Sequence, residues 1–259
     1  MVLQAIHSVF TDFSTNTASS SFAWCKAGWN TTPKLSDIIV AVIDSRDSLT
    51  VNEIFFSIQG ESTRAGRPCA FVRLAHCNLR CTYCDTEYAF DEGEKMSLED
   101  IIRRVDVYPT DLVEITGGEP LLQSAVLPLI KRFLDNGKNV LVETGGSIDV
   151  RPVDSRAILI YDIKCPDSGM MDKNLWENLS CLKPNDEVKF VLSSRVDYEW
   201  AKEQLAEWNL VSRHIVLFSP VWDQLNPREL AEWVLQDGLQ VRLQVQLHKI
   251  LWGKDVRGV

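Results

Sequence analysis

Short apolar runs alternate with amphipathic segments along most of the chain, and this alternation constrains the fold more than any other feature of the sequence. Runs rich in Val, Ile, Leu and Phe predict strands over residues 51–58, 70–74, 112–116, 139–144, 157–163, 187–192, 214–218 and 239–247. Periodic apolar positions predict helices over residues 97–107, 124–136, 197–208 and 227–236,. Ser97 suits the N-cap of the first of these helices, where Asp100 can assist it,.

Repeated strand-then-helix units imply a parallel sheet with helices packed outside it. Strands this rich in Val, Ile and Leu are typical of strands buried on both faces. About six such units predict an α/β fold whose sheet is a partial, incomplete parallel β/α barrel. Functional residues of such folds gather at the C-terminal ends of the strands. Polar and glycine-rich residues stand at those ends here, over residues 116–119, 143–146, 162–164 and 219–220.

Three of the seven cysteines, Cys77, Cys81 and Cys84, are spaced C-x3-C-x2-C in a loop after the second predicted strand. An odd number of cysteines with one tight cluster indicates a reducing compartment, with the cytoplasm as the default, and a metal or cluster site. Zinc would need a fourth ligand, such as His76 or Cys165. A [4Fe-4S] cluster on three cysteines would instead leave one iron open. Spacing alone leaves both alternatives open.

Charge and hydropathy argue against nucleic-acid-binding, membrane-spanning and secreted proteins. The net charge of −9 argues against non-specific nucleic-acid binding,. No apolar run approaches the roughly 20 residues of a membrane span, and the N-terminus lacks the pattern of a signal peptide. Residues 1–47 are rich in Ser and Thr without a clear period, and we expect them to be a poorly ordered N-terminal extension,. Residues 48–259 are expected to form the core domain.

The cysteine loop, with Tyr83 before its third cysteine and Gly-Gly-Glu-Pro at 117–120, resembles that of the radical S-adenosylmethionine (SAM) superfamily. Three further stretches narrow the resemblance: EIFFSIQGE at 53–61, FVRL at 71–74 and Cys-Asp-Thr at 84–86. Together with the ending QLHK at 246–249, they are similar to the 7-carboxy-7-deazaguanine synthase family. The resemblance spans roughly residues 49–258 and makes residues 48–259 a radical SAM core domain with the Fe–S loop at the C-terminal strand ends.

The resemblance implies a [4Fe-4S] cluster on Cys77, Cys81 and Cys84, whose open iron binds SAM,. The positions matching SAM contacts are Tyr83, Cys84, Asp85, Gly118, Glu119, Asp162, Ile163, Lys164, Ser219, Pro220, Val221 and Trp222. The positions matching contacts to the pterin substrate are Ile58, Gln59, Gly60, Glu61, Arg73, Thr116 and His248. Thr86 matches the protein ligand of a Mg²⁺ ion. No residue is expected to act as a catalytic residue, because the SAM-derived radical carries the chemistry.

The implied reaction is the ring contraction of 6-carboxy-5,6,7,8-tetrahydropterin to 7-carboxy-7-deazaguanine with loss of ammonia, for queuosine or another 7-deazapurine. The resemblance also implies a flavodoxin- or ferredoxin-type electron donor and a homodimer, with no nucleic-acid or membrane partner. Two alternatives compete with it. A glycyl-radical-enzyme activase shares the cysteine spacing and a similar Gly-Gly-Glu-Pro turn, but it would not need the Ser-Ile-Gln-Gly-Glu stretch or Arg73. A non-catalytic zinc module would need only the cysteines.

Overall fold

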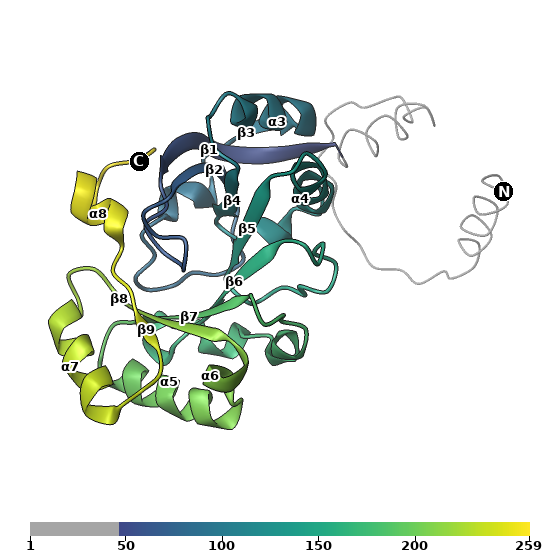
Figure 1. The fold of residues 1–259 in the computed structure, drawn as a ribbon. Helices are drawn as coiled ribbons and strands as arrows, with labels where there is room; N and C mark the ends of the chain where they lie inside the picture. The colour runs from purple at the N-terminus through teal and green to yellow at the C-terminus, as the bar shows by residue number, and fades with distance from the viewer. Residues whose placement is uncertain (1–46) are drawn as a thin grey trace, which may run out of the picture. The chain divides into compact units, whose positions relative to one another are not determined.

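The computed structural model describes residues 47–259, and residues 1–46 lie outside the described part. The predicted extension over residues 1–47 therefore stays a prediction. The described residues form a single nine-stranded sheet with helices packed against it (Figure 1). The strands are β1 (Ser48–Ile58), β2 (Pro68–Leu74), β3 (Glu94–Ser97), β4 (Leu112–Gly117), β5 (Asn139–Thr144), β6 (Ile158–Ile163), β7 (Glu187–Leu192), β8 (Ile215–Pro220) and β9 (Arg242–Leu243).

The helices of the described part follow the strand-then-helix pattern. The α-helices are α3 (Leu98–Asp106), α4 (Val126–Asp135), α5 (Arg195–Glu207), α6 (Leu210–Arg213), α7 (Pro227–Asp237) and α8 (Leu247–Trp252). The short 3-10 helices are η1 (Glu87–Phe90), η2 (Pro120–Leu122), η3 (Pro166–Ser168), η4 (Met171–Lys173) and η5 (Trp176–Ser180). The predicted cap of α3 is confirmed, because the Ser97 side chain accepts a hydrogen bond from the backbone N–H of Asp100 at 3.1 Å. None of these helices has the length and apolar character needed to span a bilayer.

The strand order is β3-β1-β2-β4-β5-β6-β7-β8-β9. Strands β2 and β4 to β9 pair in parallel, while β1 runs antiparallel to both β2 and β3. This confirms the predicted α/β fold with a mainly parallel sheet. The sheet is wider than the six units expected, because a hairpin and two short edge strands extend it.

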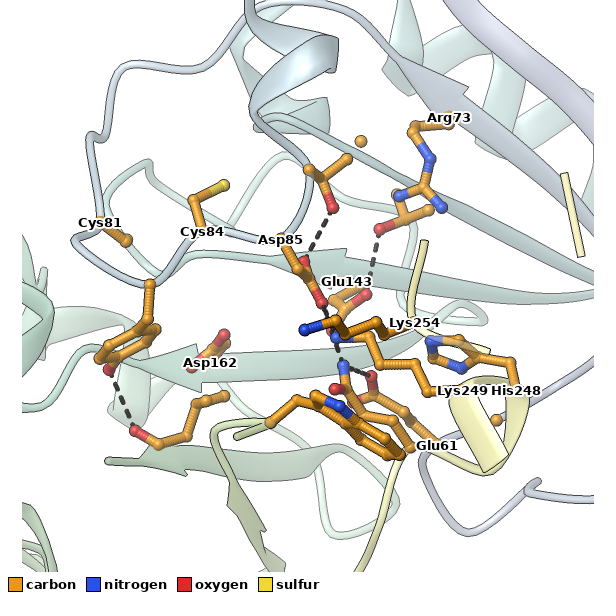
Figure 2. A pocket seen from close by; sticks show the side chains of 18 of the residues that line it. Glu61, Arg73, Cys81, Cys84, Asp85, Glu143, Asp162, His248, Lys249 and Lys254 are labelled. Carbon is orange, nitrogen blue, oxygen red and sulfur yellow. Dashed lines mark hydrogen bonds and ion pairs between the residues drawn. The ribbon is translucent and has the colours of Figure 1, made fainter. Parts of the chain in front are cut away.

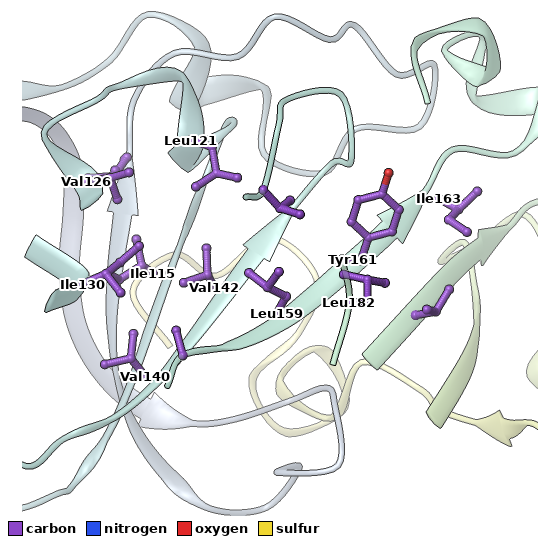
Figure 3. Packing of buried hydrophobic residues seen from close by; sticks show 14 of the residues in the cluster. Ile115, Leu121, Val126, Ile130, Val140, Val142, Leu159, Tyr161, Ile163 and Leu182 are labelled. Carbon is purple, nitrogen blue, oxygen red and sulfur yellow. The ribbon is translucent and has the colours of Figure 1, made fainter. Parts of the chain in front are cut away.

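The core lies between the sheet and its helices. In Figure 3, Ile115 of β4 and Val142 of β5 point toward Val126 and Ile130 of α4. All four side chains are at most 1% exposed. Val142 and its neighbours are β-branched residues that fit a pleated, buried surface. Burying such a side chain stabilises the fold by about 1.5–3 kcal/mol. The central strands are therefore a rigid base for the residues at their ends.

The loop after β1 reaches across to the other end of the sheet. The backbone N–H of Ser62 donates to Oε1 of Gln244, which follows β9, at 2.9 Å. The backbone N–H of Thr63 donates to Oε2 of Glu187, at the start of β7, at 3.0 Å. The sheet must curl to bring these parts together, as in an incomplete barrel. The Gln244 and Glu187 side chains, which accept from this loop, help to bridge the opening without forming a strand pair.

The predicted final strand over residues 239–247 is wrong in most of its length. Only Arg242 and Leu243 pair in the sheet, and Leu247 begins α8. The alternation of Gln with Val and Leu in this stretch is typical of a strand. The glutamines instead turn toward Glu61, and the backbone N–H of Leu247 donates to the carbonyl of Gly60 at 3.0 Å. The loop after β1 therefore takes the backbone donor of Leu247, and the chain leaves the sheet before α8.

Candidate active site

A cavity of about 780 Å³ opens at the C-terminal ends of the parallel strands. Its size is typical of small-molecule sites. Nineteen of the residues predicted from the sequence line it: Ile58, Gln59, Gly60, Glu61, Arg73, Cys77, Cys81, Tyr83, Cys84, Asp85, Thr86, Thr116, Gly118, Asp162, Lys164, Pro220, Val221, Trp222 and His248. The structure therefore brings both predicted groups, the cofactor contacts and the substrate contacts, into one cavity.

Three predicted residues do not line the cavity, namely Glu119, Ile163 and Ser219. Each is at most 2% exposed. The Glu119 carboxylate accepts from the backbone N–H of Gly145 at 2.7 Å and from the Thr144 hydroxyl at 2.9 Å. It thereby ties the ends of β4 and β5 together. For these three residues, a direct side-chain contact with a bound molecule is not supported by the geometry.

Figure 2 shows the cysteines and the other predicted contacts on different sides of the cavity. Cys81 and Cys84 lie on one side, while Arg73, Glu61 and His248 lie on the other. Asp85, next to the third cysteine, lies between them. The cavity therefore has a cysteine half and a second half, which we call the substrate half.

The cysteine loop is held by contacts outside the three thiols. The backbone N–H of Thr82 donates to the carbonyl of Ser168 at 3.0 Å. The Tyr83 hydroxyl donates to the carbonyl of Val191, at the end of β7, at 3.0 Å. The Arg80 guanidinium carbon lies 4.1 Å from the centre of the Phe90 ring. These anchors fix the loop over the strand ends, so the thiols face the cavity without bonding to each other.

The donor set fits an iron–sulfur cluster. Burial raises the pKa of all three thiols, that of Cys84 to about 11, so a bound cation is needed to hold them as thiolates at neutral pH,. Within residues 47–259, no three Cys, His, Asp or Glu side chains are arranged around a single metal ion. Three cysteine thiols are the ligands that a cluster with one open iron would take.

Neither candidate for a fourth zinc ligand faces the cavity. Cys165 is fully buried and lies outside the lining. Nδ1 of His76 lies 3.2 Å from the carbonyl oxygen of Phe90, also outside the lining. Backbone contacts at His76 instead fix the Gly117-Gly118 turn, because the N–H of Glu119 donates to the carbonyl of His76 at 2.9 Å.

Gly118 brings the end of β4 against the cysteine loop. A Cβ atom at Gly118 would stand 2.2 Å from the carbonyl oxygen of His76 and 2.9 Å from Cβ of Cys77. Both distances are shorter than side chains tolerate, so this position requires glycine. Nearby, Nζ of Lys164 pairs with Oδ2 of Asp162 at 2.8 Å, while Oδ1 of Asp162 is buried without a hydrogen-bond partner in the described structure. Asp162 and Lys164 both line the cavity, and their ion pair places one charge of each sign at the end of β6.

Arg73 lies on β2 and contributes a guanidinium group to the substrate half of the cavity. Its Nε donates to Oε1 of Glu53 on β1 at 2.7 Å, and both side chains are at most 20% exposed. The Tyr88 hydroxyl donates to the same oxygen at 3.2 Å. Because Glu53 takes Nε, the two terminal nitrogens are the part of Arg73 that can clamp a carboxylate.

The floor of the substrate half holds three carboxylates and one buried lysine. Nζ of Lys189 on β7 pairs with Oε2 of Glu61 at 2.8 Å and with Glu143 on β5. Oγ1 of Thr116 donates to Oε2 of Glu143 at 3.0 Å, and Nε2 of Gln59 donates to Glu114. Lys189 and Glu114 were not predicted from the sequence, whereas Glu143 was noted only as one of the polar residues at the strand ends. A charged residue within a strand expected to be buried on both faces is the signal that could have found Lys189 and Glu114.

The charges on this floor are set by burial and by each other. Burial opposes the charge on Lys189, but Glu143 and Glu61 outweigh it and raise the pKa of Lys189 well above its usual value. Burial also opposes the charge on Glu61, and Lys189 nevertheless lowers the pKa of that carboxyl. Burial, aided by Glu143 and Glu61, raises the pKa of Glu114 well above its usual value. The floor therefore keeps Glu61 and Lys189 charged as a pair and disfavours a charge on Glu114.

The residues after the third cysteine are tied to the C-terminal helix α8. Oδ2 of Asp85 accepts from Nζ of Lys249 at 2.6 Å and from Nε2 of Gln246 at 3.2 Å. Gln246 also donates to Oε1 of Glu61 at 2.9 Å. The Thr86 hydroxyl donates to Oδ1 of Asp85 at 2.9 Å, so the lone pairs of the Thr86 oxygen remain available to a cation. Gln246 and Lys249 thus connect the two halves of the cavity.

Gly60 and His248 are in contact at the rim of the substrate half. A Cβ atom at Gly60 would stand 2.1 Å from Nδ1 of His248 and 3.0 Å from its backbone nitrogen. Burial lowers the pKa of His248, so its imidazole is neutral at pH 7,. The 58–61 stretch and His248, both predicted to contact the substrate, therefore lie in close contact with each other.

Comparisons with known proteins agree with this site. The model of the radical SAM superfamily matches residues 72–157, which include the cysteine loop. The 7-carboxy-7-deazaguanine synthase of Chlorobaculum tepidum is 49% identical over 214 residues, covering 82% of this chain and 97% of that protein. The synthase of Koribacter versatilis is 44% identical over 226 residues, covering 82% and 100%. The crystal structure of QueE from Escherichia coli matches with a TM-score of 0.66 at 25% identity, over 78% of this chain and 95% of that one.

The fold, the cysteine loop and these matches define a radical SAM enzyme. Such enzymes use a [4Fe-4S] cluster and SAM. Within this class, the chain belongs to the 7-carboxy-7-deazaguanine synthase family.

Proposed function

We propose that the chain converts 6-carboxy-5,6,7,8-tetrahydropterin to 7-carboxy-7-deazaguanine, with loss of ammonia, in the biosynthesis of queuosine or another 7-deazapurine. The observation that carries the proposal is the joining of two half-sites in one cavity. Cys77, Cys81 and Cys84 line one half, and Arg73 with Gln59 and Glu61 lines the other. A glycyl-radical-enzyme activase would not need the second half, so its presence favours the synthase.

The cluster and SAM, when bound, supply a 5′-deoxyadenosyl radical that removes a hydrogen atom from the pterin ring. Cys77, Cys81 and Cys84 would hold the cluster. Gly118, which brings the end of β4 against the cysteine loop, would lie beside the methionyl part of SAM, and the Asp162–Lys164 pair at the end of β6 would line the same site. Orientation and exclusion of side reactions are the protein's contribution to such chemistry.

The substrate half matches the chemistry of a carboxylated pterin. The terminal nitrogens of Arg73 suit the carboxylate, because a guanidinium binds carboxylates through two parallel hydrogen bonds. The floor around Glu61 accepts hydrogen bonds and suits the N–H groups of the guanine-like edge. Gln59, held by Glu114 and by the backbone N–H of Glu61 at 3.0 Å, is fixed in one orientation. A fixed amide distinguishes donors from acceptors on the ligand.

A Mg²⁺ ion on Thr86 is part of the proposal. Oγ1 of Thr86 donates its hydrogen to Asp85, so its lone pairs are directed away from that carboxylate. Mg²⁺ takes oxygen ligands, keeps several waters and often shares substrate oxygens. An ion there would bridge Thr86 to the substrate carboxylate. Binding of Mn²⁺ as a spectroscopic substitute, and its loss in Thr86→Val, tests this point.

Two partners and a location complete the proposal. A flavodoxin- or ferredoxin-type protein would supply the electron. A homodimer is supported by apolar side chains exposed on α8 and beside it, including Ile250, Leu251 and Trp252 at 57%, 53% and 40%. Light scattering of the purified protein checks the oligomeric state. The cytoplasm remains the proposed location, since the six cysteines within the described part are free thiols.

An anaerobic assay distinguishes the competing functions. Protein purified without oxygen should be brown and contain about four irons per chain. A colourless protein that carries zinc would contradict both radical functions. Reconstituted protein should form the deazapurine from SAM, a reductant, Mg²⁺ and the carboxypterin. An activase would cleave SAM and leave the pterin unchanged.

A further inference from the structure

The last six residues of the chain form one wall of the cavity. Residues 254–259 line it, although they follow α8 and belong to no further helix or strand. The chain enters this stretch through Gly253, whose φ of 95° is in the region that favours glycine,. We call residues 254–259 the C-terminal segment.

Two ion pairs fasten the C-terminal segment to two different parts of the rim. Nζ of Lys254 pairs with Oδ2 of Asp223, which follows β8, at 2.6 Å. Nη1 of Arg257 pairs with Oε2 of Glu92, between η1 and β3, at 3.0 Å. All four side chains are at least half exposed, so the pairs are weak,. These two ion pairs therefore contribute little to the stability of the core.

Arg257 also contacts the residues that hold Arg73. Its guanidinium carbon lies 3.7 Å from the centre of the Tyr88 ring, a distance typical of a stacked guanidinium,. Tyr88 donates its hydroxyl to Oε1 of Glu53, the oxygen that accepts from Nε of Arg73. A continuous series of contacts thus runs from the solvent-exposed Arg257 to the cation of the substrate half.

This arrangement links Arg73 to Arg257, which lies 184 positions later in the chain. Tyr88 lies on η1 and is half-buried, and its hydroxyl is directed at Glu53. If the ring turned away, Glu53 would lose one of its two donors, and the direction of the Arg73 fork would no longer be fixed. A stacked cation on the ring opposes that rotation.

We propose that Arg257 is a positioning residue for Arg73. By stacking on Tyr88 it fixes the hydroxyl on Glu53, which directs the two terminal nitrogens of Arg73 at the carboxylate of an anionic substrate. The same contact closes the C-terminal segment over the substrate half. This inference rests on the proposed function, because it assumes a carboxylated substrate, but it concerns binding and can fail separately.

Steady-state kinetics of three single variants under anaerobic conditions test the proposal first. Arg257→Met should raise KM for the carboxypterin about tenfold, since small misplacements of binding groups have effects of this order. Arg257→Lys keeps the charge but loses the planar stack, so it should resemble Arg257→Met. Arg228→Met is the matched control: Arg228 is exposed on α7, pairs with Glu232 at 2.9 Å and does not line the cavity. It should leave KM unchanged.

The decisive arm is the double variant. In an Arg73→Ala background, Arg257→Met should have no further effect on KM, because its route to the substrate is already removed. A full tenfold effect in that background, or an unchanged KM for Arg257→Met alone, would overturn the proposal. The iron content and the SAM-dependent change in the cluster spectrum should equal those of the parent protein in every variant, which excludes a general folding defect.

Equilibrium binding separates this inference from the proposed function. Quenching of tryptophan fluorescence by the carboxypterin, without reductant, reports affinity alone. If the parent protein binds the pterin but forms no deazapurine, the proposed function fails while the positioning role stands, provided that Arg257→Met weakens binding about tenfold. Equal binding by the parent protein and by Arg257→Met refutes the positioning role whatever the turnover result.

Discussion

Replacing Lys189 with methionine should destabilise the protein more than any other single loss of a cation in the described part. Lys189 has a 6% exposed side chain and is paired with Glu61 and Glu143. Methionine has a similar length and would fill the space, so the main effect is the loss of charge. It leaves Glu61 and Glu143 together with Glu114 on the same floor, without their cation. Removing one partner of a buried ion pair typically costs about 3–5 kcal/mol, and we expect a loss in that range at pH 8.

The loss should shrink as the pH falls. Without Lys189, Glu61 and Glu143 have no cation beside them and resemble Glu114. Burial already raises the pKa of Glu114. Groups with a folded-state pKa above the unfolded value contribute stability that is fully present below the unfolded pKa, and it is lost as the pH rises through the folded pKa. Lysine itself stays charged throughout this range in both states. The variant should therefore lose stability between pH 5 and pH 8 more steeply than the parent.

Urea unfolding followed by tryptophan fluorescence at pH 5.5 and pH 8 measures both effects. Lys131→Met is the matched control, because Lys131 pairs with Asp135 on the surface of α4, with side chains 62% and 46% exposed. Its loss should be within about 0.5 kcal/mol at both pH values. A loss below about 1 kcal/mol for Lys189→Met at pH 8, or one that does not depend on pH, would refute the assigned charge balance.

Two further predictions concern Gly118, directly after β4, and Glu114 on β4. Gly118→Ala should lower the iron bound per chain, because its Cβ would displace His76 and Cys77. Gly137→Ala crowds no atom within 4 Å but strains a backbone with a φ of 78°, so it controls for a loss of stability away from the cysteine loop and should keep the parent iron content,. Equal iron in both variants would contradict the close approach. Glu114→Gln should remove part of the pH dependence of stability. The parent protein loses stability as the pH rises above the usual glutamate pKa toward the raised pKa of Glu114,. Relative to the parent, the glutamine variant should therefore be more stable at pH 8 than at pH 5. Urea midpoints that shift equally at both pH values would show that Glu114 is ionised in the folded protein.

The sequence predicted the elements whose signals are local. The buried strands and the cap at Ser97 follow from period and residue type, and the cysteine spacing marks its own loop. The stretch 239–247 was misassigned because its alternation is real but its glutamines bond to Glu61, about 180 residues away (244 minus 61 is 183). A pattern within a short window carries no information about such a partner.

The same reason explains the site residues that were missed. Lys189 pairs with residues 128 and 46 positions away, and Lys249 pairs with Asp85 across 164 positions. Each is an ordinary lysine until the fold brings its carboxylate to it. Arg73 was identified through the resemblance of its motif, whereas its support by Glu53 and Tyr88 required the structure.

Anaerobic turnover with the carboxypterin tests the central claim most directly. Reconstituted protein, SAM, a reductant and Mg²⁺ are incubated with 6-carboxy-5,6,7,8-tetrahydropterin, and the products are analysed by mass spectrometry. We predict 7-carboxy-7-deazaguanine from the parent protein, none from Cys81→Ala, which should lack the cluster, and reduced formation by Arg73→Ala with an intact cluster. A parent protein with a full cluster that cleaves SAM but leaves the pterin unchanged would contradict the account.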